Sequence, residues 1–169
     1  MRKWQVLLLV VFLGCGNAAR TEFVSAYAAL SEIELSRASG REPLRFENRR
    51  ELDRHIARLV KRLHTASWQY AWLELRRIGR YAVPALIDEL SDTTRSAVTA
   101  KALPGVVTPG ERIFLTRGEV AYALLREIIG DYSNYRGTLP PFDKKAWEDW
   151  WRQNRSRINI HTDVVLGSG

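Results

Sequence analysis

Apolar residues recur at helical spacing over most of this 169-residue chain. The clearest run lies within residues 46–67, where Asn48 and Glu51 have the spacing of a helix capping box. The apolar positions that follow share one helical face: Leu52, Ile56, Leu59, Val60 and Leu63. Arginine and lysine occupy the other face, so the pattern predicts an amphipathic helix with a strongly basic outer side.

A helical hairpin is predicted at residues 66–92. Its first apolar stripe runs from Trp68 to Ile78 and stops at Gly79, and its second, with Pro84 in the first turn, continues to Leu90. Glycine commonly ends a helix, and proline is tolerated at a helix start. Two short amphipathic helices cannot bury their apolar faces alone, so other helices must cover them.

Further helices are expected on either side of these. An apolar stripe from Phe23 to Ile33 predicts a helix that ends before Pro43, and Thr116 with Glu119 supplies a second capping box, for a helix that ends at Gly130. Asp143 precedes a last helix that is rich in tryptophan.

Two segments lack this helical period. Residues 93–116 contain two Pro-Gly pairs, which break regular structure, and "RIFL" at 112–115 reads as a short extended piece. We interpret residues 93–116 as an inserted loop. The tail, residues 159–169, is either a short strand or irregular.

Residues 73–92 resemble a HEAT-like repeat of the kind found in phycobilisome-lyase-type and other bacterial repeat proteins. Ile78-Gly79 closes a first helix, "AVPALI" at 82–87 opens a second, and "YAWLELRRI" at 70–78 aligns without a gap to "VAYALLREI" at 120–128. The resemblance implies an all-α fold, a short α-α superhelix over residues 21–158 that closes with the tryptophan-rich helix. It is informative about the fold and says little about function.

The first residues have the layout of a secretory signal. Arg2 and Lys3 precede an uncharged apolar run from Val6 to Leu13, which is far shorter than the roughly 20 residues that a membrane-spanning helix needs. We therefore predict a signal peptide at residues 1–14.

The only cysteine in the chain, Cys15, directly follows this predicted signal peptide. Leu13-Gly14-Cys15 resembles the lipobox of bacterial lipoproteins, which implies that Cys15 is lipidated and that residues 15–20 form a lipid-anchored linker. Gly16 and Asn17 then imply delivery to the outer membrane of a two-membrane bacterium, facing the periplasm or the surface, or to the outer face of the membrane in a single-membrane host. The alternative is a general signal peptidase that cuts after Ala18 and removes the cysteine.

Charge and histidine spacing argue against several classes of function. The net charge of +7 comes from arginine scattered among acids, which favours weak attraction to anionic surfaces, and an exported chain would not meet DNA, so no nucleic-acid partner is expected. His55 and His64 lie on opposite sides of one helix, and no phosphate-binding glycine loop is present. We expect no metal, no cofactor and no catalytic residues.

The predicted function is a non-enzymatic, envelope-anchored lipoprotein that acts as a helical scaffold for another envelope protein. The candidate binding residues are cations on one helix: Arg54, Arg58, Lys61 and Arg62. The alternative is a module that binds a glycan, an anionic lipid or another polyanion through exposed Trp and Arg. Most tryptophans lie on apolar stripes and should fill the core, although Trp150 and Trp151, about 100° apart on a helix, cannot both be central.

Overall fold

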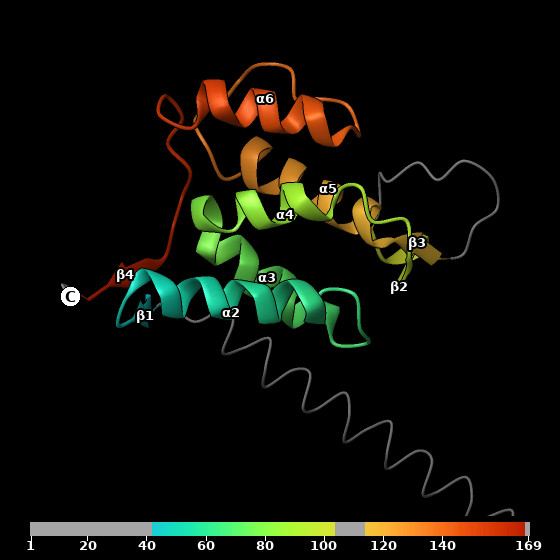
Figure 1. The fold of residues 1–169 in the computed structure, drawn as a ribbon, viewed down its shortest axis with the longest axis horizontal. Helices are drawn as coiled ribbons and strands as arrows, with labels where there is room; N and C mark the ends of the chain where they lie inside the picture. Colours follow the sequence, from blue (N-terminus) through green and yellow to red (C-terminus); the bar gives the residue numbers. More distant parts are fainter. Residues whose placement is uncertain (1–41, 104–113, 168–169) are drawn as a thin grey trace, which may run out of the picture. The chain divides into compact units, whose positions relative to one another are not determined.

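Five α-helices make up about half of the part of the chain that the computed structural model describes, residues 42–103 and 114–167 (Figure 1). They are α2 (Arg49–Arg62), α3 (Trp68–Ile78), α4 (Val83–Glu89), α5 (Arg117–Gly130) and α6 (Lys144–Asn154). Short 3-10 turns, η1 (Gly79–Tyr81) and η2 (Ala100–Ala102), follow α3 and β2. The predicted signal peptide, Cys15, the linker and the helix at Phe23–Ile33 lie outside the described residues.

Four short strands correct the all-α prediction. β1 (Leu44–Phe46) pairs in parallel with β4 (Val164–Leu166), and β2 (Arg95–Thr99) pairs antiparallel with β3 (Phe114–Thr116). The first pair joins segments from opposite ends of the described chain, and the second lies within the predicted insertion. The fold is therefore mostly helical with two small sheets.

The strands were not predicted from helical periodicity because their buried positions alternate with a period of two. In β2, Ser96 and Val98 are buried while their neighbours Arg95 and Ala97 are exposed, the alternation of a half-buried strand. Of the two alternatives for the tail, β4 shows the short strand, over Val164–Leu166, and the extended piece predicted at 112–115 is confirmed in part by β3.

The predicted helix starts are confirmed by their caps. The Asn48 side chain accepts a hydrogen bond from the Glu51 N–H, although the Glu51 carboxylate returns to the Glu47 N–H rather than to residue 48. Thr116 and Glu119 form a complete capping box at α5. Asp143 accepts from the Ala146 N–H at the start of α6.

α3 and α4 pack mainly on α2 and α5 rather than on each other as a hairpin would, but the turn between them falls at Gly79, as predicted. Its φ of +56° lies in the left-handed region that favours glycine, and an added Cβ would approach the His161 carbonyl oxygen to 2.1 Å. The turn therefore requires glycine both for its backbone angle and for the close passage of the tail.

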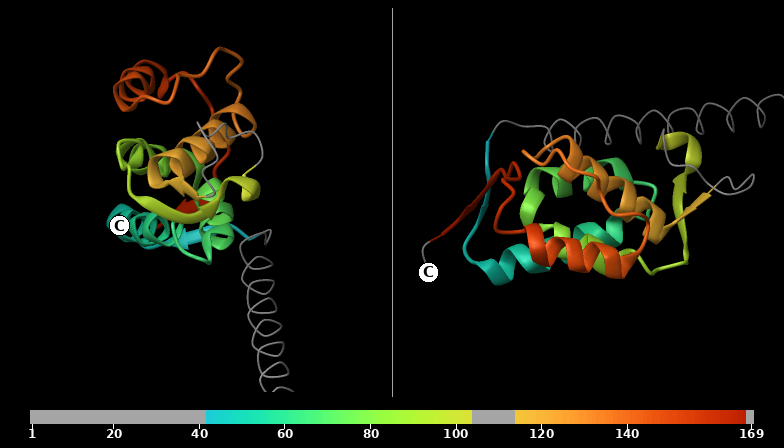
Figure 2. Two further views of the ribbon diagram at one scale, coloured as in Figure 1. Left: turned by 90° about the vertical axis from the view of Figure 1, so that its right-hand side faces the viewer. Right: turned by 90° about the horizontal axis from the view of Figure 1, so that it is seen from above.

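The helices stack in order along the chain. In Figure 1 and in the left view of Figure 2, α2 and α3 lie on one side, α4 and α5 in the middle, and α6 on the far side. The main packed pairs are α2 with α3, α4 with α5, and α6 with α4. The apolar face predicted for α2 is fully buried, and α5 contributes Leu124, Leu125, Ile128 and Ile129 to the same core.

None of the helices in the two described ranges has the length and apolar character needed to cross a membrane.

Candidate functional site

The cations predicted as binding residues are divided by the structure. Arg54, Arg58 and Lys61 are exposed and continue a row that begins at Arg50, with helical spacings of four, four and three. We call these four residues the α2 basic face. Arg62 differs: it is half-buried, its Nε donates to Ser67 Oγ at 2.9 Å, and its guanidinium lies 4.5 Å from the ring centre of Tyr70. It contacts α3 rather than continuing the exposed row.

One member of the α2 basic face also contacts a buried pair. Arg58 Nη2 lies 3.3 Å from His55 Nδ1, and His55 Nε2 lies 2.8 Å from Glu74 Oε1 on α3. Since Arg58 can only donate, His55 accepts at Nδ1 and donates from Nε2 to the glutamate. This chain of contacts fixes α2 against α3.

The environment of Glu74 favours its charged form. Burial alone would raise the pKa of this carboxyl, but hydrogen bonds from His55 and Tyr70 outweigh burial, and the pKa is lowered. Glu74 is 5% exposed, so its Oε1 is compensated by the hydrogen bond from His55 rather than by water, while its Oε2 has no hydrogen-bond partner among the described residues.

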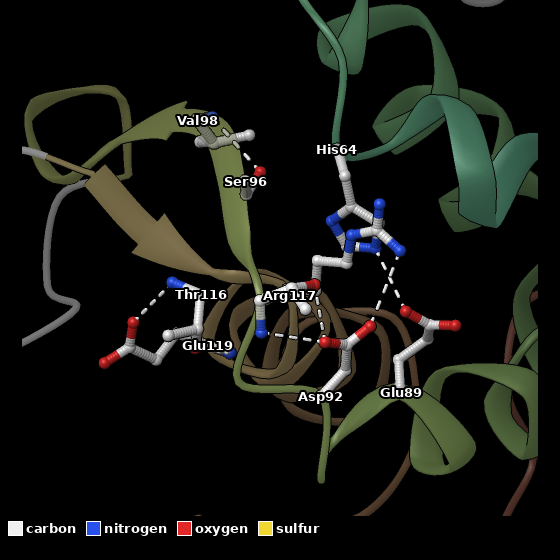
Figure 3. Close-up of polar contacts among 9 residues, drawn as sticks. His64, Glu89, Asp92, Ser96, Val98, Thr116, Arg117 and Glu119 are labelled. Carbon is white, nitrogen blue, oxygen red and sulfur yellow. Dashed lines mark hydrogen bonds and ion pairs between the residues drawn. The ribbon is translucent and has the colours of Figure 1, made fainter.

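A second histidine cluster lies where α2, α4, β2 and α5 meet (Figure 3). His64, just beyond the end of α2, is buried, and its Nε2 is 3.3 Å from Glu89 Oε2, yet neither ring nitrogen has a hydrogen-bond partner among the described residues. Asp92 is bound by Thr94 at 2.8 and 2.6 Å and lies 3.5 Å from Arg117 Nη1.

These surroundings keep the His64 imidazole neutral at pH 7. Burial, with the Arg117 charge, lowers the pKa of His64 to about 4. Burial and the charge of Asp92 raise the pKa of Glu89, whereas hydrogen bonds from Thr94 lower the pKa of Asp92. Burial therefore disfavours the charged forms of both His64 and Glu89 in this contact. Ser96, also drawn in Figure 3, accepts a hydrogen bond from the Val98 N–H.

The third histidine is separate from both clusters. His161 lies in the tail, is exposed, and pairs with Asp163 at 2.9 Å. Within the described ranges, no group of three or more His, Cys, Asp or Glu side chains is arranged to hold a metal ion.

The tryptophans divide as the helical stripes suggest. Trp72 and Trp147 are buried, as expected for core residues, and Trp72 Nε1 donates to Glu127 Oε2 at 2.8 Å. Trp150 is half-buried and donates to the Tyr135 hydroxyl at 3.2 Å. Trp151, 100° around the helix from Trp150, faces a surface groove instead.

We call this feature the α4–α6 groove. It consists of two adjoining cavities of about 360 and 320 Å3 that share Pro84, Trp151 and Arg155. The first is also lined by Arg49, Arg80, Tyr81 and Ser156. The second is also lined by Ile87, Asp88, Glu148 and Arg152.

Sequence patterns did not reveal this groove, because its cations come from α2, η1 and the end of α6. The adjacent pair Trp150-Trp151 was the one local signal, since two neighbouring tryptophans on a helix cannot both be central. Chemically, the groove offers guanidinium donors beside an aromatic surface.

No protein-family model, no curated protein and no solved structure matches this chain. The groove and the α2 basic face are therefore interpreted from their own geometry.

Proposed function

We propose that this protein is a non-enzymatic bacterial lipoprotein, anchored in the cell envelope through Cys15, that binds another envelope protein through the α2 basic face. The observation that carries the proposal is the exposed row Arg50, Arg54, Arg58 and Lys61 on one side of α2. Asp53, on the same helix, pairs with Arg49, which lies outside the row. The expected partner surface is acidic, because opposite charges attract and orient the two proteins.

The rigidity of α2 supports a binding role for this face. The opposite side of the helix is buried in the core through Leu52, Ile56 and Leu59, and His55 ties it to Glu74. A partner that binds the exposed row would meet a preformed surface, which reduces the entropic cost of association.

The finer description of the fold as a HEAT-like α-α superhelix is part of the proposal. Its support is the order of packing: α2 packs on α3, α4 packs on α5, and these two pairs contact each other through α2 with α4 and α3 with α5, as stacked helical pairs would. The aligned segments 70–78 and 120–128 lie in α3 and α5, the second helix of each packed pair, and these two helices also contact each other.

The anchor is tested by expressing the full chain with labelled palmitate in a two-membrane bacterium. Wild-type protein should carry the label and fractionate with membranes, while Cys15→Ser should lose both properties. Unlabelled wild-type protein cleaved after Ala18 would contradict the lipoprotein assignment.

The interaction is tested by placing a photo-cross-linking amino acid at Ala57, an exposed position beside the α2 basic face, in intact cells. We expect one protein adduct of defined mass, lost when Arg54 and Arg58 are both changed to Glu. A probe at Gln153, exposed on α6, is the matched control and should not give that adduct. An adduct unaffected by charge reversal would contradict the proposal.

A second candidate function, binding of a glycan or polyanion, is favoured by one specific observation. The α4–α6 groove places Arg49, Arg80 and Arg155 around one cavity beside Trp151.

A further inference from the structure

We propose that the α4–α6 groove binds an acidic sugar, a pyranose that carries a carboxylate or a phosphate group. This inference rests on the second candidate function and assigns to it a site and a ligand class. It does not involve the α2 basic face, so the two surfaces can be tested separately.

The charge of the groove is concentrated at one end. Three guanidinium groups, those of Arg49, Arg80 and Arg155, line the cavity of about 360 Å3, and no carboxylate is among its described lining residues. Clefts lined by one sign of charge focus the field and concentrate ligands of the opposite sign. The ligand that fits this end carries a negative group.

Two of these cations are available for a ligand. Arg80 donates from Nη2 to the Arg155 carbonyl, which ties η1 to the end of α6 and fixes the guanidinium across the groove. Neither Arg80 nor Arg155 forms an ion pair within residues 42–103 and 114–167. A guanidinium has five N–H donors in a planar fork, so both retain donors that match the two oxygens of a carboxylate or phosphate.

The third cation is already engaged and shapes the wall. Arg49 pairs with Asp53 at 2.8 Å, and its guanidinium lies 4.8 Å from the ring centre of Tyr81. This contact holds Tyr81 in place at the cationic end, where its ring adds flat apolar surface.

The middle of the groove is apolar and flat. Trp151 and Pro84 line both cavities and supply this apolar surface, and Arg155, which also lines both, places its guanidinium beside them. Trp151 is half-buried, so part of its indole remains open to the groove. An aromatic face next to charged donors suits a ligand with one apolar face and a polar edge. A pyranose ring has both, because its C–H groups gather on one face and its hydroxyls project from the rim.

The far end of the groove is electrically balanced. Asp88 and Glu148 lie 3.3 and 3.8 Å from Lys144 Nζ, and Arg152 pairs with Asp149 at 3.1 Å. The acidic group of the ligand therefore belongs at the Arg80–Arg155 end, and neutral sugar hydroxyls at the balanced end. Cavities of this size fall in the usual range for small ligands, roughly 300–1,000 Å3.

Two envelope sources share this ligand chemistry: carboxylated amino sugars of peptidoglycan and phosphorylated glucosamine of lipopolysaccharide. The test is calorimetric titration of the full, lipid-anchored chain in detergent with N-acetylmuramic acid, a phosphorylated N-acetylglucosamine, neutral N-acetylglucosamine and inorganic phosphate. At least one acidic sugar should bind about tenfold or more tightly than the neutral sugar and the free phosphate, since a charge-assisted fork and the aromatic face act together. Which acidic sugar binds identifies the source.

Arg155→Gln should weaken that binding about tenfold, because it removes a guanidinium but keeps the main-chain carbonyl that Arg80 needs. Arg126→Gln, which removes an exposed arginine of α5 outside the groove, is the matched control and should bind as wild type. Trp151→Leu should weaken binding of the sugar without changing binding of inorganic phosphate. Urea denaturation of each variant checks that the fold is retained.

Two outcomes would overturn the site while leaving the second candidate function intact. One is binding of an acidic sugar that is lost on changing Arg54 and Arg58 to Gln but not in Arg155→Gln. The other is binding of inorganic phosphate as tight as binding of the sugar phosphate, which would remove the sugar from the assignment. If no acidic sugar or phosphate binds at all, the site and the second candidate function both fail.

Discussion

Two histidines of the α2 region each face a glutamate on another helix. His55, within α2, pairs with Glu74 on α3. His64, just beyond the end of α2, lies against Glu89 on α4. The first pair is 2.8 Å apart and joins a chain of hydrogen bonds, with Arg58 on the other ring nitrogen and Tyr70 on the glutamate. The second is 3.3 Å apart, and its ring nitrogens have no hydrogen-bond partner among the described residues.

The two pairs show that the pKa of a buried glutamate moves in opposite directions depending on whether it accepts hydrogen bonds. At Glu74, bound by donors, the pKa falls despite burial. At Glu89 the pKa rises, and the pKa of His64 falls to about 4, because burial disfavours each charged form. The opposite charges nearby, Arg117 for Glu89 and Asp92 for His64, do not offset burial. The same two residue types thus stabilise one helix contact and weaken another.

The largest expected loss of stability comes from breaking the His55–Glu74 pair. Glu74→Ala should lower the free energy of unfolding by about 3 kcal/mol, since it removes a buried carboxylate and leaves His55 and Tyr70 without their acceptor. Urea denaturation of the full chain measures this loss. Glu148→Ala, on the exposed side of α6, is the control and should cost under about 0.5 kcal/mol. A loss at Glu74 below about 1 kcal/mol would contradict the hydrogen-bonded role.

As the pH falls, stability should first be lost at the His64–Glu89 pair. In the unfolded chain His64 binds a proton near pH 6.5, but in the folded protein only near pH 4, so between these values the unfolded state binds more protons and stability falls as pH falls. The expected loss from His64 between pH 7 and pH 5 is about 2 kcal/mol. Denaturation at several pH values measures it.

Neighbouring groups allow this acid effect to be assigned. Glu74 has a lowered pKa and destabilises only below its ordinary value of 4.5, and the raised pKa of Glu89 acts in the opposite direction to His64. Asp92 and Arg117 also face the cluster, and Arg117 stays charged throughout. A His64 resonance that titrates above pH 6 in NMR would refute the assignment.

Replacing each histidine by leucine should change the unfolding free energy in opposite directions at the two sites. His64→Leu should raise the unfolding free energy by about 1 kcal/mol at pH 7 and remove most of the acid slope, because it deletes two buried ring nitrogens that lack hydrogen bonds. His55→Leu should lower stability, because it leaves Glu74 without a donor. Equal effects of the two substitutions would mean that the pairs do not differ as described.

The smallest effect is expected at Glu89→Gln. This change removes a charge that the surroundings already disfavour and should alter the unfolding free energy at pH 7 by less than about 0.5 kcal/mol. The corresponding Glu74→Gln, which removes a favoured charge, should cost more. Chemical denaturation of the two variants side by side decides the order.

Local sequence signals predicted the five helices of residues 42–103 and 114–167 with little error. Caps at Asn48, Thr116 and Asp143 and the break at Gly79 act within a few residues of themselves, and the apolar face of α2 follows from its period. The strands were harder, because β1 and β4 are three residues each and are stabilised by pairing across more than a hundred residues. The all-α prediction failed for that reason.

The sequence by itself determined where the helices begin and end and which of their faces are buried, because capping and periodicity are encoded within one or two helical turns. Only the tertiary structure decided which side chains contact each other across helices. Arg62 packs on Tyr70, and His55 hydrogen-bonds to Glu74. Arg80 and Arg155 come together beside Trp151. Those contacts join segments that packing alone brings together. The charge states of the two histidine pairs follow from the same packing, because burial and hydrogen bonding, not residue type, set their pKa values.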